Sequence, residues 1–370
     1  MDARFLPVPL PSHPTNVLRV SVLDQSPVSD GSTGAAALRN TIDLACLADS
    51  LGYHRYWVAE HHGSPMLAGP SPEVLIAAIA SATPRMRVGS GGVMLPHYSA
   101  LKVAESFSVL AGLFPHRIDL GLGRAAGTDS STAFALQRDR RQRLPDDFPQ
   151  QLAELLGYLT DSLPADHPFR RLAALPGLPE HPEPWLLGSS HQSAIWAAEL
   201  GLPYAFADFI NPAGAEIAAL YRERFTPSPE LAEPRVMVAV SAISADSDED
   251  AQRLASSMRM AITLLRAGSL IAVPSVETAL EFLAHHPAPH SLPMGRRAIV
   301  GEPAAVRAAL ESVAREYDAS EVMVVTITHD HSARRHSYEL LAREFGLGTA
   351  SSRRGIIAER DHSRTRSPTR

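Results

Sequence analysis

A cluster of ionisable side chains lies in the stretch YWVAEHHGSP, residues 56–65. Strand-forming residues run into Glu60, His61 and His62, and a Gly-Ser-Pro loop follows them. One carboxylate beside two imidazoles could bind a metal ion, move protons at an active site, or serve only as packed polar groups that pair with each other. The stretch alone leaves all three uses open.

A second candidate site is the sequence LLGSSHQSAIW. Gly188, Ser189 and Ser190 end an expected strand, and Ser193 falls in the first turn of the expected helix. Free backbone N–H groups and the positive end of the helix dipole converge at such a position, so hydroxyl groups beside them favour phosphate binding. Arg124, at the end of the preceding expected strand, could supply a charged fork. The alternative is that Ser190 only caps the helix.

Glycines are concentrated in the sequence GSGGVM, residues 89–94. Glycine weakens a strand interior, so three glycines within four residues indicate a special requirement. A flat ligand that lies against the backbone at Gly91 and Gly92 would meet it, and so would a strained peptide bond. Tight packing at a corner of the sheet is the alternative.

A third histidine-rich segment is HDH, residues 329–331, which has the His-x-His form of some metal-dependent barrels. Such barrels normally place the pair after the first strand and distribute further ligands around the barrel. Here the segment follows the last expected strand, and the other strand ends show no Asp or Glu pattern that would complete a site. We therefore expect no metal ion, at this segment or at His61.

These segments are positioned by apolar strands that alternate with amphipathic helices, which is typical of a parallel sheet covered on its outside. Eight βα units in one chain predict an α/β fold of the (β/α)8 TIM-barrel type, with catalytic groups at the carboxyl ends of the strands. A doubly wound open sheet is the alternative, but the chain shows neither two halves nor a G-x-G-x-x-G at its first turn. The expected strands are 18–27, 53–62, 86–96, 116–124, 183–190, 202–209, 234–244 and 320–330.

The signals for helix starts agree with the predicted barrel. Two long segments interrupt the alternation of strands and helices. Ser71 and Pro72 are suited to the N-cap and first turn of a helix. A helix is expected at 246–268, after the seventh strand. Residues 129–183 and 269–297 are less regular, and we expect them to be insertions after strands four and seven, of the kind that often form lids.

The expected domain organisation is simple. Residues 1–17 form an N-terminal extension, and residues 18–348 form a single barrel domain. Residues 349–370 are polar and rich in arginine, and we expect this tail to be disordered.

Composition excludes several classes of protein. The 370 residues are 45% hydrophobic and 20% charged, with a net charge of −6, which argues against a nucleic-acid-binding protein. No apolar run approaches the roughly 18 residues of a membrane helix, and prolines interrupt the N-terminus where a signal peptide would need an apolar core. A single cysteine, Cys46, is expected to be a buried small hydrophobe. We expect a cytoplasmic protein with no membrane association.

The chain resembles the bacterial luciferase-like flavin monooxygenases, and more narrowly the luciferase-like oxidoreductases often associated with natural-product gene clusters. The resemblance runs in order from Leu18 to Gly346. The motifs that carry it are VLDQSPV, WVAEHHGSP, VGSGGVMLPHYSALKVAESFSVL, RIDLGLGRAAGTD, LLGSS, SAIWAAELGLPYAFA and EVMVVTITHDHSARRHSYELLA.

The resemblance implies roles for particular residues. His61 matches the active-site histidine near the reactive edge of the flavin. Gly91 and Gly92 match a pair joined by a non-prolyl cis peptide bond, against which the isoalloxazine ring packs. Arg124 matches the arginine that binds the flavin phosphate, together with the segment that supplies Gly188, Ser189, Ser190 and Ser193.

Other matched positions limit the inference. Glu105 matches a carboxylate of structural role in the third helix. The reactive cysteine of luciferase itself falls at Gly123, and a glutamate next to its phosphate site falls at Ser189. These departures weaken any claim of light emission or of an aldehyde substrate.

The activity implied is a two-component monooxygenase. Reduced FMN (FMNH2) comes from a separate NAD(P)H:flavin reductase, O2 forms a flavin C4a-(hydro)peroxide, and a small organic substrate such as a polyketide or other secondary metabolite is oxidised. The alternatives are an F420-dependent oxidoreductase of the same fold, which transfers hydride without oxygen, and a flavin-binding relative without catalysis.

The resemblance also implies a homodimer. The helix at 71–83 is small and apolar, because it carries Ala77, Ala78, Ala80, Ser81 and Ala82. Helices at this position and at 99–112 form the dimer interface in the family, so we expect a C2 homodimer through them. The alternative is that these helices only cover the barrel.

Overall fold

The computed structural model describes residues 18–124, 129–137, 140, 147–286 and 298–348. The expected N-terminal extension (1–17) and arginine-rich tail (349–370) lie outside these residues. Within the described part of the chain, no helix combines the length and the apolar content that a bilayer crossing requires.

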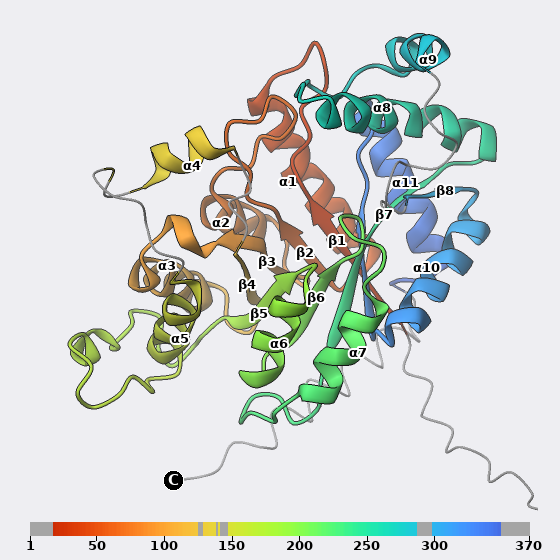
Figure 1. Ribbon diagram of the computed structural model, residues 1–370. Coiled ribbons are helices and arrows are strands. Elements are labelled where there is room, and N and C mark those ends of the chain that lie inside the picture. The colour runs from red at the N-terminus through yellow and green to blue at the C-terminus, as the bar shows by residue number, and fades with distance from the viewer. Residues whose placement is uncertain (1–17, 125–128, 138–139, 141–146, 287–297, 349–370) are drawn as a thin grey trace, which may run out of the picture.

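Eight parallel strands close into a barrel, which confirms the predicted (β/α)8 fold (Figure 1). Each strand pairs with the next from β1 to β7, and β9 closes the ring between β7 and β1. A short ninth strand, β8, pairs in parallel with β7 outside the ring. The strands are β1 (Arg19–Asp24), β2 (Arg55–Val58), β3 (Arg87–Met94), β4 (Ile118–Gly123), β5 (Glu183–Gly188), β6 (Tyr204–Ala207), β7 (Val236–Ser244), β8 (Ala298–Gly301) and β9 (Glu321–Val325).

Helices surround the barrel, and their buried apolar faces form most of the core between helix and sheet. The helices that follow the barrel strands are α1 (Gly34–Leu51), α2 (Pro72–Ala82), α3 (Ala100–Leu113), α4 (Ser130–Leu136), α5 (Phe148–Leu159), α6 (His191–Glu199), α7 (Ala215–Arg224), α8 (Asp248–Arg266), α9 (Val276–His285), α10 (Pro303–Tyr317) and α11 (His331–Glu344). Two single turns of 3-10 helix are η1 (Leu95–His97) and η2 (Arg170–Leu172).

Helix ends follow the sequence signals closely. The side chain of Thr33 caps α1 by accepting a hydrogen bond from the N–H of Ala36, and Gly52 ends the helix with a φ of 91°. Ser71 and Pro72 stand at the start of α2 as expected, but no capping hydrogen bond from the Ser71 side chain is present there. Proline at the first position therefore sets this helix start through its fixed φ.

The insertion after β7 was expected at residues 269–297, but in the structure it also includes the helix that precedes them. The helix expected at 246–268 is α8, which does not cover the barrel wall but packs with α9 and β8 near the mouth of the barrel (Figure 1). The region 269–297, expected to be irregular, contains α9. The helix that covers the wall between β7 and β9 is α10.

Charged side chains close the floor of the barrel, at the amino ends of the strands. The Arg55 guanidinium lies 2.8 Å from the Asp119 carboxylate and 2.9 Å from that of Glu321, and all three side chains are buried. Asp119 also accepts a hydrogen bond from the Trp57 indole at 2.8 Å. Trp57 and Trp185 pack edge to face above this floor, with ring centres 5.5 Å apart.

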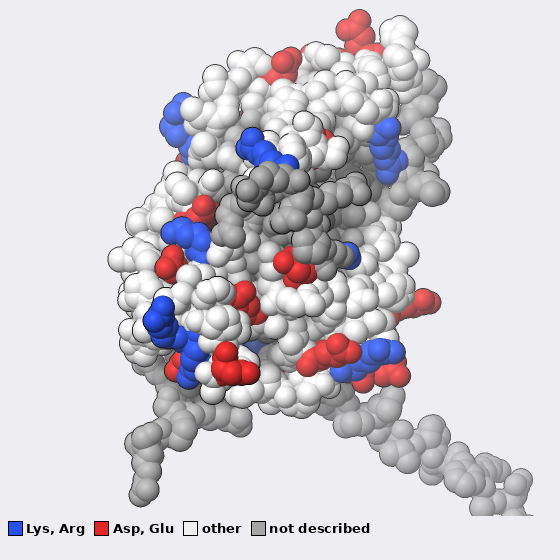
Figure 2. Space-filling model, turned by 60° about the vertical axis from the view of Figure 1, so that its left-hand side comes forward, with Lys and Arg blue, Asp and Glu red and all other residues white. Residues whose placement is uncertain are grey.

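Two surface features remain. Cys46 is exposed on α1, so the prediction that it is buried was wrong. The reason is helical phase, because Leu44, Ala45 and Ala48 carry the buried face of α1 and Cys46 falls beside it. On the face shown in Figure 2, acidic and basic side chains are interspersed among uncharged ones.

Candidate active site

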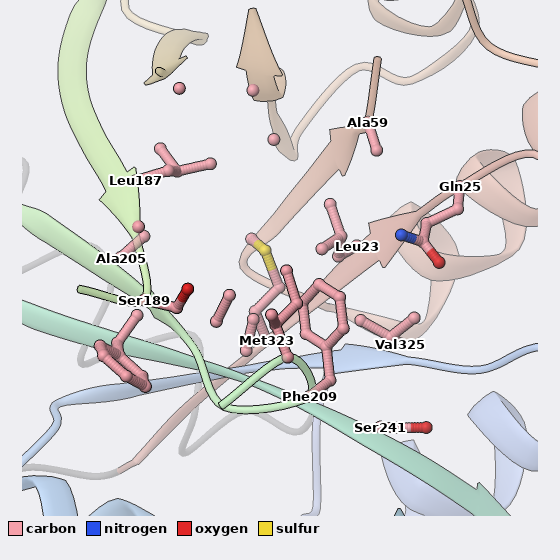
Figure 3. Close-up of a pocket in the computed structure, with 18 of the residues that line it drawn as sticks. Leu23, Gln25, Ala59, Leu187, Ser189, Ala205, Phe209, Ser241, Met323 and Val325 are labelled. Carbon is pink, nitrogen blue, oxygen red and sulfur yellow. The ribbon is translucent and has the colours of Figure 1, made fainter. Parts of the chain in front are cut away.

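A cavity of about 690 Å³ lies within the barrel and opens toward the carboxyl ends of the strands, a volume typical of small-molecule sites. Its walls are mainly apolar, and Figure 3 shows Leu23, Phe209 and Met323 among the side chains that point into it. Trp57 connects the cavity to the charged floor, because its ring lines the cavity while its indole N–H bonds to Asp119.

His61 is the member of the Glu-His-His cluster that faces this cavity. Its Nε2 lies 3.3 Å from the amide nitrogen of Gln25, which follows β1 and also lines the cavity. The backbone N–H of His61 donates to the carbonyl of Gly69 at 2.9 Å, which fixes the segment after β2. The imidazole is therefore held between two strand ends, where it can exchange a proton with a bound molecule.

Glu60 and His62 do not line the cavity. Glu60 is fully buried, and its carboxylate lies 2.7 Å from His62 Nε2. The same carboxylate accepts hydrogen bonds from the backbone N–H of Met94 at 2.9 Å and from the Tyr98 hydroxyl at 3.0 Å. Burial and this carboxylate raise the pKa of Tyr98. The pair thus anchors the end of β2 to the end of β3, a packing role.

The peptide bond between Gly91 and Gly92 is cis, as the resemblance implied. Both glycines line the cavity, and the β3–β4 register shifts between Ser90 and Val93. A Cβ on Gly91 would lie 2.5 Å from Leu23 Cδ1, and one on Gly92 would lie 2.8 Å from the carbonyl oxygen of Gly121. Gly91 and Gly92 are therefore closely packed against neighbouring residues, and their backbone also lines the cavity, where a ligand can reach it.

The serines after β5 cap α6 and also line the cavity. Ser190 and Ser193 form a reciprocal capping box, and the Ser193 hydroxyl lies 2.9 Å from that of Tyr204. Gly188 is required beside them, because a Cβ there would lie 2.1 Å from Ser193 Oγ. Ser189 lies next to β5 at the cavity (Figure 3), with its carbonyl held by the Asn211 amide at 3.1 Å. Capping and ligand binding are thus compatible.

Arg124 follows β4 directly and lines the same cavity. Its guanidinium carbon lies 5.6 Å from the centre of the Trp196 ring on α6. This cation–π contact holds Arg124 against α6, the helix that the serines cap. The structure therefore brings together the arginine and the hydroxyl groups that the sequence suggested as a phosphate site.

Other charged candidates at strand ends lie outside the cavity. Asp24 is buried at the end of β1, 2.6 Å from the Arg334 guanidinium. Burial opposes its ionisation, but Arg334 and hydrogen bonds outweigh this effect and lower the pKa of Asp24. Asp330 caps α11 through the N–H of Ala333, and His331 pairs with Asp43 at 2.8 Å. Among the described residues, no group of three or more His, Cys, Asp or Glu side chains could hold a metal ion.

The sequence analysis missed the part of the cavity wall that comes from α8. One face of this helix lines the cavity with Ala255, Met258, Arg259, Ala261, Ile262 and Leu265. The sequence predicts a helix at 246–268, but none of its residues was assigned to the site. A usable signal was Arg259, an arginine among apolar residues with no acidic residue three or four positions away.

Comparison with known proteins decides the family. The family model described as luciferase-like monooxygenase matches residues 18–319. The chain belongs to the luciferase-like monooxygenase family. It is therefore an oxidoreductase of the monooxygenase class.

Three similar proteins illustrate this membership. A luciferase-like monooxygenase of Escherichia coli is 42% identical over 86% of this chain and 95% of its own length. The N-acetyl-S-alkylcysteine monooxygenase of Bacillus subtilis is 35% identical over 88% of this chain and 98% of its own. The crystal structure of apo-MsnO8 superimposes with a TM-score of 0.81 at 41% identity, covering 89% of this chain and 99% of that one.

The cavity of this luciferase-like chain fits a flavin mononucleotide. A flat ring system can lie on Gly91 and Gly92, where no side chain intervenes, and a phosphate can reach Arg124 and the amino end of α6. Apolar walls between these two ends suit the remainder of such a ligand.

Proposed function

We propose that the protein is the oxygenating component of a two-component monooxygenase that uses reduced FMN and O2. The observation that carries this proposal is the cavity itself, which joins a side-chain-free glycine surface, a histidine and an arginine–serine cluster within one apolar enclosure. Bound reduced flavin would supply the oxygen chemistry.

The proposed cofactor contacts follow from these positions. The FMN phosphate lies at Arg124, with hydroxyl and N–H groups from Ser189, Ser190 and Ser193. The absence of a side chain at Gly188 leaves room for the Ser193 hydroxyl at this end. The Gly91–Gly92 backbone would hold the isoalloxazine ring, and Leu23 and Trp57 pack against Gly91.

His61 is the proposed proton-transfer residue. It faces the cavity beside Gln25, and in this proposal its Nε2 would hold or donate a proton at the reacting end of the cavity while Gln25 holds the imidazole in orientation. The apolar walls exclude water from the reacting atoms, which limits wasteful release of hydrogen peroxide.

The proposed substrate is a small organic molecule with an apolar body, because the cavity walls are mainly apolar. Polyketides and other secondary metabolites fit this description, and so do thioethers such as those named in the N-acetyl-S-alkylcysteine monooxygenase. Reduced FMN comes from a separate NAD(P)H:flavin reductase in the cytoplasm.

We further propose a C2 homodimer through α2 and α3. Apolar side chains are exposed on both helices, with Val74 67% exposed on α2 and Leu113 65% exposed on α3. Val109 adds to this surface on α3, and Ala78 is exposed on α2. Burial of these side chains against a second copy would remove apolar surface from water.

Anaerobic titration tests the cofactor. The protein is titrated separately with reduced FMN and reduced F420, each product is mixed with oxygen, and the absorbance and substrate products are recorded. Tight binding of reduced FMN and an oxygen-dependent oxidised product are expected. Binding of F420 with hydride transfer to a carbonyl, in the absence of oxygen, would refute the proposal, and binding without any turnover would indicate a non-catalytic relative.

A further inference from the structure

Arg259 lies on the face of α8 that lines the cavity, among Ala255, Met258 and Ile262. These neighbours are apolar, and within the described wall of the cavity Arg259 is the charged residue that α8 contributes. Its side chain is partly buried, and loss of water there lowers the pKa of its guanidinium. A partly desolvated arginine among apolar side chains favours an anionic partner.

The described residues supply no carboxylate for it. Among the residues that the structure describes, Arg259 forms no ion pair. Its guanidinium donates a hydrogen bond to the neutral amide oxygen of Gln252. The acidic residues of α8, from Asp248 to Asp250, lie in its first turn. Arg259 lies nine positions after Asp250, or roughly 13 Å along the helix axis, which is too far for a contact.

The charged side chains among the described residues of the cavity wall are basic. No Asp or Glu is among the described residues that line the cavity, whereas Arg124 and Arg259 both line it. The two arginines come from different places in the fold, the end of β4 and the face of α8 over the mouth. In the proposed function Arg124 takes the cofactor phosphate, so the second arginine has a different anion to bind.

We propose that Arg259 binds an anionic group of the substrate, and that the substrate is an apolar molecule that carries a carboxylate. This inference rests on the proposed function for the identity of the site. The apolar body lies among the side chains of α8 and of the barrel, and the carboxylate accepts hydrogen bonds from the Arg259 fork. Arg259 is thus a residue that determines specificity, and it takes no part in the oxygen chemistry.

Matched pairs of acids and esters test this assignment. The probes are N-acetyl-S-benzylcysteine, 4-phenylbutyrate and decanoate, each compared with its methyl ester. Their binding to the full-length protein is measured by calorimetry, with and without FMN. Arg259→Ala is compared with Arg253→Ala, which removes an exposed arginine from the same helix. FMN and riboflavin are titrated into each variant.

For the wild-type protein, at least one acid should bind roughly tenfold or more tightly than its ester, since a charged partner strengthens a hydrogen bond by about that factor. Arg259→Ala should abolish this preference, and Arg253→Ala should keep it. The proposal is overturned if no acid is preferred by the wild type, or if the preference survives in Arg259→Ala. A loss of FMN affinity in Arg259→Ala, with riboflavin affinity unchanged, would also overturn it by assigning Arg259 to the cofactor phosphate.

Failure of the proposed function gives a different result. If FMN does not bind the wild type, the cofactor assignment fails, while the comparison of acid and ester in the absence of FMN still reports on Arg259.

Discussion

Gly188 offers a direct test of the proposed phosphate site, because it leaves the space that the Ser193 hydroxyl occupies. In Gly188→Ala the new Cβ would lie 2.1 Å from Ser193 Oγ and 2.5 Å from Ser193 Cβ. Both distances are far below contact, so Ser193 must move. It would lose its part in the capping box of α6 and its place at the cavity.

The cost can be worked from these contacts. Loss of a cap destabilises a protein by about 1 kcal/mol, and an added methyl group in a packed site by about 1–3 kcal/mol. We therefore expect Gly188→Ala to lower the free energy of unfolding by about 2–4 kcal/mol. A lost hydrogen bond to a phosphate is worth about 1.5–3 kcal/mol, so FMN affinity should fall roughly 10- to 100-fold. Riboflavin, which has no phosphate, should be affected much less.

The assay is fluorescence titration with FMN and riboflavin, together with urea unfolding. Gly123→Ala is the matched control, because Gly123 also lines the cavity but its added Cβ would meet the flexible Met94 side chain, with Sδ at 3.2 Å. The reasoning is refuted if Gly188→Ala lowers FMN and riboflavin affinity equally, or if it is no more harmful than Gly123→Ala.

Three further predictions follow from other parts of the structure. His61→Ala should bind FMN normally but oxidise substrate at least roughly 10²-fold more slowly; an equal loss in His62→Ala with FMN binding intact would contradict the choice of His61. Ala78→Arg should convert the proposed dimer to a folded monomer in sedimentation, whereas Ala304→Arg, exposed on α10, should not; a monomeric wild type at micromolar concentration would rule out the dimer. Burial opposes ionisation of Glu183, but Arg55, Arg87 and Arg235 outweigh it and lower its pKa from 4.5 to about 2. A depressed pKa stabilises the fold above pH 4.5, and this contribution is lost as the pH falls toward 2. From pH 6 to pH 3.5 the wild type should therefore lose about 1 kcal/mol more unfolding free energy than Glu183→Gln in urea titrations; equal losses would contradict the shift.

The barrel could be predicted from the sequence because the pattern of an apolar strand followed by an amphipathic helix repeats along the chain. Each strand is apolar and each following helix is amphipathic, so eight weak signals support one another. The strand β8 lacks this support, because its four residues Ala298–Gly301 are short and pair with β7 alone. The orientation of α8 was missed for a related reason, since an apolar helix face does not reveal whether it covers a wall or a mouth.

The site was predictable at the level of segments and less so at the level of atoms. His61 and His62 are chemically identical neighbours, and their type and spacing do not show which of them faces the cavity; the family resemblance pointed to His61. The backbone turn after β2 directs His61 toward Gln25 and His62 toward Glu60. Ser190 and Ser193 posed a similar question, because capping and ligand binding are both roles for a serine, and the structure shows that one does not exclude the other.

Several buried carboxylates of the barrel are held by a partner and do not line the cavity. Asp24 binds Arg334, Glu60 pairs with His62, and Asp119 and Glu321 share Arg55 in the floor. Among the described residues that line the cavity there is no Asp or Glu, and the fixed charges there are those of arginine. In a cavity with mainly apolar walls, basic side chains favour anionic ligands. The same distribution of charge thus supports both a phosphate-bearing cofactor at Arg124 and an acidic substrate at Arg259.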